Sequence, residues 1–450
     1  MASWTTDQVL ALAPDASSVK AGQGLANPGK WVRLEKNERS LWGECQGSGA
    51  NPYRTQVDLT GPAFNCSCPS RKFPCKHGLG LMLILAGKPQ HVKDAEPPPW
   101  VAEWISKREI STEKKAAKAQ TEAAPADPET IAKREAEREK RAAKRDDRVR
   151  SGLGELQTWL SDVIRQGLAH AQQQPTQFWD GMAARMVDCQ APGIARVLRE
   201  LPGVFASGDG WADRALEELG KLQLLLQGYQ RLETLPEALR QDVRTSIGWT
   251  VGEEELAKIT PVSERWQIVG QRIEEEDRLR VQRTWLIGEQ TRRPALCLSF
   301  SVAGQPLDVS LVPGVAIDAD LTFHPSAAPL RAVVKQRRGE PSSIIVPAAV
   351  ANFAEALETT STLIAGSPWL ERFPWFVQGC VPILSEDQWL LRDANGSVIP
   401  LARQFAHPWP LLALSGGNAI TVFGEWNGRT LLPLSAFADG HFISLGGASI

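Results

Sequence analysis

The spacing of apolar residues divides this chain into regions of different structure. Helical spacing at 6–13 and 17–25 is followed by segments in which apolar and polar residues alternate. Because a period of two is typical of half-buried strands, we expect three short strands at 31–35, 41–45 and 55–59.

A helix expected at 76–86 is unusual, because its residues 79–86 are apolar on every side. A surface helix has only one apolar stripe, so we expect the small sheet to cover one side of this helix and another domain to cover the other. Residues 88–104 contain three consecutive prolines and two tryptophans, and we interpret them as a stiff exit rather than a folded unit. From 107 to 150 the chain is mostly Ala, Glu, Lys and Arg, which predicts a charged linker, partly helical or disordered.

Amphipathic helical spacing resumes at 151–170 and indicates a compact helical bundle. Breaks are expected at Pro192-Gly193, Pro202-Gly203 and 208–210, and they separate further helices at 176–187, 193–200, 211–226 and 235–246.

After residue 260 the pattern becomes that of strands. Candidate strands lie at 266–273, 280–287, 296–302 and 308–312, and a helix is expected at 348–363. Two Asn-Gly pairs, at Asn395 and Asn427, lie between alternating segments and predict hairpins. Hairpins imply antiparallel pairing, so this last part is expected to be mostly β with one or two helices.

Composition and charge narrow the class of protein. The 450 residues are 42% hydrophobic and 23% charged, as in soluble globular proteins. Without a long apolar run or a signal-like N-terminus, we expect a cytoplasmic protein with reduced thiols and no membrane contact. The net charge of −2 hides an asymmetry, because residues 1–150 hold 25 Lys and Arg against 19 Asp and Glu.

The strongest chemical signal is the pattern C-x-C-x6-C-x-H formed by Cys66, Cys68, Cys75 and His77. Three thiolates and one imidazole complete a tetrahedral donor set and leave no position for a reactive water. The sequence therefore predicts one structural zinc ion rather than a hydrolytic centre. The alternative is a chance cluster or a disulfide, which this spacing and reduced thiols disfavour.

The motif, the strands before it and the apolar helix that begins Cys-Lys-His-Gly-Leu resemble the SWIM zinc finger. The resemblance covers about residues 30–90 closely, and the whole chain is also similar to stand-alone bacterial SWIM proteins. It implies zinc ligands at Cys66, Cys68, Cys75 and His77 and a module proposed to bind DNA or proteins. It implies no catalytic residues, and the chain lacks the helicase and transposase motifs of larger members.

The predicted architecture is a multidomain α+β protein. It comprises an N-terminal SWIM module at 1–100, a charged helical or disordered linker at 101–150, a helical bundle at 151–255 and a β-rich α+β domain at 256–450. The module is expected to have a ββ–zinc knuckle–α fold.

Two binding functions remain open for the module. Seven cations could contact phosphates and three aromatic residues could stack on bases, or the same residues could be an ordinary solvated surface and the core of a small sheet. The residues predicted to touch nucleic acid or a protein partner are Arg54, Arg71, Lys72 and Lys76. The sequence pI of about 6.4 is below that of strongly basic nucleic-acid-binding domains, so a protein partner is preferred and DNA is the alternative.

No catalytic motif is evident, and we expect a non-enzymatic protein without a small-molecule substrate. A hydrolase-type nucleophile elbow and a phosphate loop are both missing from the sequence. The thiols of Cys45, Cys189, Cys297 and Cys380 are expected to be buried and inert. The remaining histidines are isolated in sequence and are interpreted as surface or capping residues: His91, His170, His324, His407 and His441.

Overall fold

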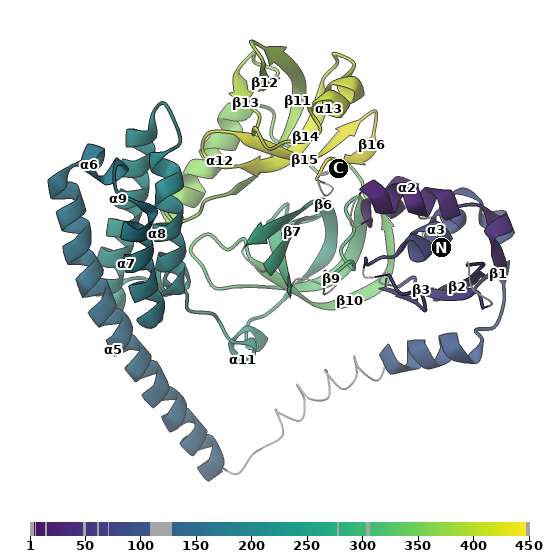
Figure 1. Cartoon of the computed structure of the whole chain (residues 1–450), viewed down its shortest axis with the longest axis horizontal. Helices are drawn as coiled ribbons and strands as arrows, with labels where there is room; N and C mark the ends of the chain where they lie inside the picture. The colour runs from purple at the N-terminus through teal and green to yellow at the C-terminus, as the bar shows by residue number, and fades with distance from the viewer. Residues whose placement is uncertain are drawn as a thin grey trace.

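The computed structural model places a small zinc-finger-like module and a helical bundle on opposite sides of a central β-sheet, with a second sheet beside it (Figure 1). The structure describes residues 4, 6–13, 16–47, 51–60, 63–70, 72–108, 128–276, 279–302 and 307–446. The expected multidomain α+β class is confirmed: an N-terminal strand–helix module, a central helical region and C-terminal antiparallel sheets.

The N-terminal module is a five-stranded sheet with its first three helices on one face. Its elements are α1 (Thr6–Ala11), α2 (Ala16–Leu25), β1 (Trp31–Lys36), β2 (Ser40–Cys45), β3 (Tyr53–Asp58), β4 (Ala63–Cys66), α3 (Lys76–Gly87) and β5 (Lys93–Asp94). The strand order is β4-β3-β2-β1-β5, and only the β1–β5 pair is parallel. The three expected strands are present. β4 and β5 were not predicted, because four and two residues are too few to show alternation.

Helix α3 is buried along most of its length, as its apolar composition predicted. The strands β2, β3 and β4 cover one side, and α1 and α2 cover another. Elements of the same module therefore cover both of these sides of α3, whereas a second domain was expected to cover one of them. The helices α2 and α3 lie so close together that a Cβ atom at Gly80 would be 2.7 Å from Leu25 Cβ. Glycine is therefore needed at this position. The module in turn shares one continuous hydrophobic core with the central sheet.

The segment at 88–104 is folded, and its interpretation as a stiff exit is wrong. A 3₁₀ turn at Pro89–His91 leads into β5, which pairs with the open edge of β1. A helix then runs over residues 99–108. The side chains of Val92 and Val101 are buried, so this segment gains both backbone pairing and apolar burial from the module.

The helical bundle begins within one long helix. Its elements are α5 (Pro128–Gln166), α6 (Leu168–Gln172), α7 (Thr176–Asp188), α8 (Pro192–Phe205), α9 (Trp211–Gln230) and α10 (Glu237–Ile247). The boundary expected at residue 150 lies inside α5, whose residues from Val149 onward enter the bundle core. The break expected at Pro202 does not occur, because Leu201 and Phe205 continue the buried stripe of α8.

The central sheet is antiparallel and curls so that its edge strands meet. After the short helix α11 (Glu253–Ala257), its strands are β6 (Val262–Glu276), β7 (Leu279–Gly288), β8 (Pro294–Val302), β9 (Val315–Phe323) and β10 (Ala332–Ser343). The order is β10-β9-β6-β7-β8. Leu296 of β8 nevertheless bridges to Arg331, beside β10, which gives the sheet a barrel-like shape (Figure 1).

The last sheet has the order β13-β12-β11-β14-β15-β16. Its elements are α12 (Phe353–Gly366), β11 (Phe373–Ser385), β12 (Gln388–Arg392), β13 (Val398–Pro400), α13 (Pro408–Ser415), β14 (Ile420–Trp426), β15 (Leu431–Ala438) and β16 (His441–Ser444). Both Asn-Gly hairpins form. The strand expected at 308–312 is a loop, whereas β9, β10 and β11 were not predicted.

Candidate metal centre

The four predicted metal ligands come from three consecutive pieces of the module. Cys66 ends β4, Cys68 follows it in a turn, Cys75 is the N-cap of α3, and His77 lies in the first turn of that helix. The strand pairing of β3 with β4 sets the position of Cys66. The buried helix α3 sets the position of the other pair.

The structure brings all four side chains together. One potential ligand atom from each of Cys66, Cys68, Cys75 and His77 lies within 4.8 Å of the others. His77 Nδ1 is 3.7 Å from Cys66 Sγ and 4.0 Å from Cys75 Sγ. Zinc bonds of about 2.0–2.3 Å in a tetrahedron put the donors roughly 3.5–3.8 Å apart. The donor atoms therefore surround a space of the right size for one zinc ion.

Polar groups around the sulfurs favour their ionised form. Backbone amides donate from Cys68 to Cys66, from Ser70 to Cys68 and from Gly78 to Cys75. Thr55 Oγ1 lies 3.2 Å from Cys66 Sγ. The ring of Tyr53 packs against His77, with centroids 4.9 Å apart. Such contacts orient metal ligands and tune their affinity.

The three thiols compete for a single negative charge. A hydrogen bond from Cys66, assisted by His77 and Gly78, lowers the pKa of Cys75 to about 4 even though burial opposes it. Conversely, the hydrogen bond with Cys75 and burial raise the pKa of Cys66, and burial raises the pKa of Cys68. A bound divalent cation would remove this competition, since it favours the thiolate at all three sulfurs.

The donor set fits zinc in a structural role. Three sulfurs and one imidazole are ligands that zinc accepts in tetrahedral sites. His77 would coordinate through Nδ1, which requires the proton of the neutral ring to lie on Nε2. Such an ion would join β4 to α3 across the loop between them.

The other thiols lie outside this cluster. Cys45, Cys189, Cys297 and Cys380 are all buried and free, as expected. Burial raises the pKa of Cys45, and it raises the pKa of Cys297 and of Cys380 to about 12. Protonated, enclosed thiols of this kind pack as small apolar groups.

The structure describes three of the four predicted contact residues. Arg54 Nε lies 3.4 Å from Glu44, and its guanidinium also lies 5.7 Å from the ring centre of Trp100. Lys72 is exposed and donates to Ser17 Oγ at 2.6 Å. Lys76 is exposed at the start of α3. Arg71 lies outside the described residues.

Sequence reasoning missed a groove on the other face of the same sheet, which we call the tryptophan groove. Its volume is about 420 Å³, and it lies between β3–β4 and the helix at 99–108. Gln56, Asn65 and Ser67 line the sheet side, and Trp100 and Trp104 line the helix side. The spacing of four between the two tryptophans was the available signal, since it places both on one face of a helix.

The comparisons with known proteins agree with this architecture. Residues 53–86 match the SWIM zinc finger, and residues 144–247 match the SWIM-associated four-helix bundle domain. No curated protein and no solved structure matches the chain. Among the helices that the structure describes, none has the length and apolarity needed to cross a membrane. The chain is thus similar to the SWIM zinc finger across the metal centre and to the SWIM-associated four-helix bundle domain across α5–α10.

Proposed function

We propose that this protein is a non-enzymatic adaptor whose zinc-stabilised module holds an extended segment of a partner protein in the tryptophan groove. The observation that carries the proposal is the position of this groove on the strand of a metal ligand. Cys66 belongs to the donor set, and its neighbours Asn65 and Ser67 line the groove. Successive residues of a strand point to opposite faces, so an ion bound below the sheet would stabilise the groove floor above it.

The lining of the groove suits a peptide. Two half-buried indoles offer large apolar surfaces with a polar N–H. The amides of Gln56 and Asn65 can donate to and accept from a peptide backbone. In addition, β4 is the edge strand of its sheet, and edge strands can pair with an extended chain.

Charge pairing within the module supports a protein partner over DNA. Four of the cations that could contact phosphates have acidic partners: Arg33 with Glu35 at 3.7 Å, Lys36 with Asp94 at 2.8 Å, Arg39 with Asp58 at 3.8 Å and Arg54 with Glu44 at 3.4 Å. Phosphate binding relies on cations that neutralise the backbone. Paired cations neutralise the phosphate backbone less well, because each cation would first have to break its ion pair with a carboxylate.

A non-enzymatic role is supported by the donor set at the metal centre. Three sulfurs and one nitrogen fill a tetrahedral zinc. A catalytic zinc keeps one coordination position for water or substrate. The predicted ion has four protein ligands and would therefore stabilise the fold of the module.

The test is peptide selection on the full-length, zinc-loaded protein. A library of random extended peptides displayed on phage should yield a shared motif, and Trp100→Ala should weaken binding of the selected peptide about tenfold or more, as expected for a central tryptophan anchor. Trp409→Ala is the matched control, because Trp409 is 63% exposed on α13 in the C-terminal domain. Zinc content would confirm that each variant remains folded.

Two results would contradict the proposal. One is a selection without a shared motif, or with a motif whose binding does not depend on Trp100. The other is tight binding of duplex or single-stranded DNA that weakens with salt and with Lys72→Ala, which would favour the nucleic-acid alternative.

A further inference from the structure

A large cavity lies where the helical bundle meets both C-terminal sheets, far in sequence from the metal centre. Its volume is about 960 Å³, which is in the range of small-molecule sites. Arg199 reaches it from α8 and Arg283 from β7, while Arg331 directly precedes β10 and Arg372 directly precedes β11. We call it the junction cavity.

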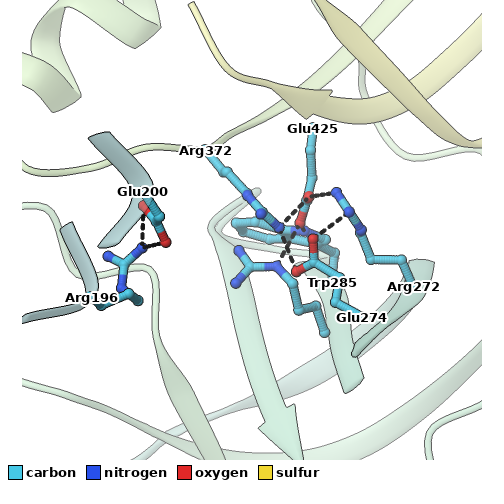
Figure 2. A network of polar contacts seen from close by, with 8 residues as sticks. Arg196, Glu200, Arg272, Glu274, Trp285, Arg372 and Glu425 are labelled. Atoms are coloured by element: carbon cyan, nitrogen blue, oxygen red, sulfur yellow. Dashed lines mark hydrogen bonds and ion pairs between the residues drawn. The ribbon is translucent and has the colours of Figure 1, made fainter. Parts of the chain in front are cut away.

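One wall of the junction cavity adjoins a buried network of ionic contacts (Figure 2). Glu425 accepts from Arg272 at 3.0 Å, from Arg283 at 3.0 Å and from the Trp285 indole at 2.7 Å. Its side chain is only 2% exposed. Figure 2 shows Glu425 between Arg372 and Arg272, with Glu274 joining the same two arginines from below. This network holds β6, β7 and β14 together and stiffens the wall.

On the other side of the cavity, Arg196 pairs with Glu200 and also with Glu371 at 2.9 Å. The second pair links the bundle to the chain just before β11. The indole of Trp369 donates to Lys221 O at 3.1 Å and makes the same connection. The junction cavity is therefore built from elements that are fixed to one another.

Not all of the arginines around the cavity are neutralised by these pairs. Among the described residues, no carboxylate lies within ion-pairing distance of Arg331 or Arg199, although both line the cavity. Arg283 contacts Glu425 through Nε, and within the described part of the chain its terminal nitrogens have no hydrogen-bond partner, so they remain for a ligand. Burial lowers the pKa of Arg331, because a charged guanidinium loses part of its hydration when it is enclosed.

His324 lies near two cations, Arg331 and Lys335. Burial, then Arg331 and Lys335, lower the pKa of His324 to about 4. Its imidazole is therefore neutral near pH 7, and its buried Nε2 has no hydrogen-bond partner among the described residues. This corrects the expectation of an ordinary surface or capping histidine, because His324 lines the cavity.

We propose that the junction cavity binds a phosphate-bearing small molecule of about nucleotide size. Arginines from four separate segments line one space, and guanidinium groups bind phosphate oxygens through two parallel hydrogen bonds. Trp249 and Trp369, which are both half-buried, add indole surfaces to the lining, which suits a ligand that also carries a planar ring. The junction cavity and the tryptophan groove share no lining residue.

The test is calorimetric titration of the full-length, zinc-loaded protein with ATP, pyrophosphate and adenosine as probes. ATP and pyrophosphate should bind with one site per chain, and adenosine should bind at least about tenfold more weakly than ATP, since it lacks the charged groups. Arg331→Gln should weaken pyrophosphate binding about tenfold or more, and Arg331→Lys should restore part of the affinity.

Arg338→Gln is the matched control. Arg338 lies on β10, the strand that begins directly after Arg331, but it pairs with Asp320 at 2.7 Å and does not line the cavity. Its loss should therefore leave the affinity unchanged. Failure of both ATP and pyrophosphate to bind at millimolar concentration would overturn the proposal. Equal affinities of the wild type and Arg331→Gln, or an equal loss in Arg338→Gln, would also overturn it.

Discussion

The metal centre and the network around Glu425 are two ways of burying polar groups in one chain. At the metal centre, like groups converge: three sulfurs and one imidazole that only an added cation can satisfy together. Around Glu425, opposite charges converge, with Arg272, Arg283 and Arg372 against two carboxylates. The opposite charge for the first cluster would come from an ion outside the chain, whereas the chain itself supplies both charges of the second.

The two clusters also differ in how far the chain must fold to form them. The metal ligands lie between residues 66 and 77, within one module. The hydrogen bond from Arg272 to Glu425 joins residues 153 positions apart. Loss of the ion should thus unfold the module around it, whereas loss of Glu425 should weaken the contact between two sheets.

The largest effect is expected from Cys75→Ser. Removing one sulfur breaks the donor set, and metal binding contributes on the order of 10 kcal/mol to the folding of small zinc domains. The N-terminal module should lose its zinc and unfold. Elemental analysis and hydrogen exchange of residues 53–86 would measure both losses.

Cys45→Ala is the control for this variant. Cys45 is fully buried in the same module but is not part of the donor cluster. The Cys45→Ala variant should keep its full zinc content and should lose only a little stability from poorer packing. If Cys75→Ser retained a full equivalent of zinc, the assignment of the ligands would be wrong.

A smaller effect is expected from Glu425→Gln. The amide cannot neutralise the arginines that converge on this position, and breaking a buried ion pair costs about 3–5 kcal/mol. Urea denaturation would measure the loss in the free energy of unfolding. Arg429→Gln is the control, because its pair with Glu217 is about half exposed and should contribute less than about 1 kcal/mol. Similar losses in the two variants would contradict the distinction between buried and surface pairs.

The smallest effect is the pH dependence of the difference between wild type and Glu425→Gln. Burial alone would raise the pKa of Glu425, but Arg283, the Trp285 indole, Arg372 and Arg272 together lower it below its usual value. A carboxyl whose pKa is lower in the folded state stabilises the fold above its unfolded pKa, about 4.3 for Glu. That stability is lost as the pH falls through the folded pKa.

Urea unfolding between neutral pH and the acid limit of folding would follow this loss. The gap between wild type and Glu425→Gln should be constant above about pH 5 and should narrow below about pH 4. A gap that widened on acidification would show that Glu425 is not held in its charged form by the arginines.

Local patterns predicted much of the fold. The helices of the bundle and the two Asn-Gly hairpins were visible, since each depends on a few neighbouring residues. The strands β9 and β10 were missed, and the segment at 308–312 was predicted as a strand in their place. The long helix α5 shows the same limit: its exposed part and its buried part have different compositions, yet they form one continuous helix.

The site residues divide in the same way. The four metal ligands were predicted because their spacing in the chain is itself the signal. Trp100 and Trp104 were noticed but interpreted as part of an exit, since only the packing of their helix against β3 and β4 creates the groove. His324 was isolated in sequence, and its position in the cavity depends on the meeting of three units.

The sequence alone determined the donor set of the metal centre and the order of the helical and β regions, because both follow from residues that are close along the chain. Only the tertiary structure decided which cations are paired, which tryptophans share a groove and which arginines surround the junction cavity. These properties depend on contacts between distant segments. Such contacts form only when burial and ion pairing bring distant residues together in the folded molecule. They therefore cannot be predicted from a short stretch of sequence.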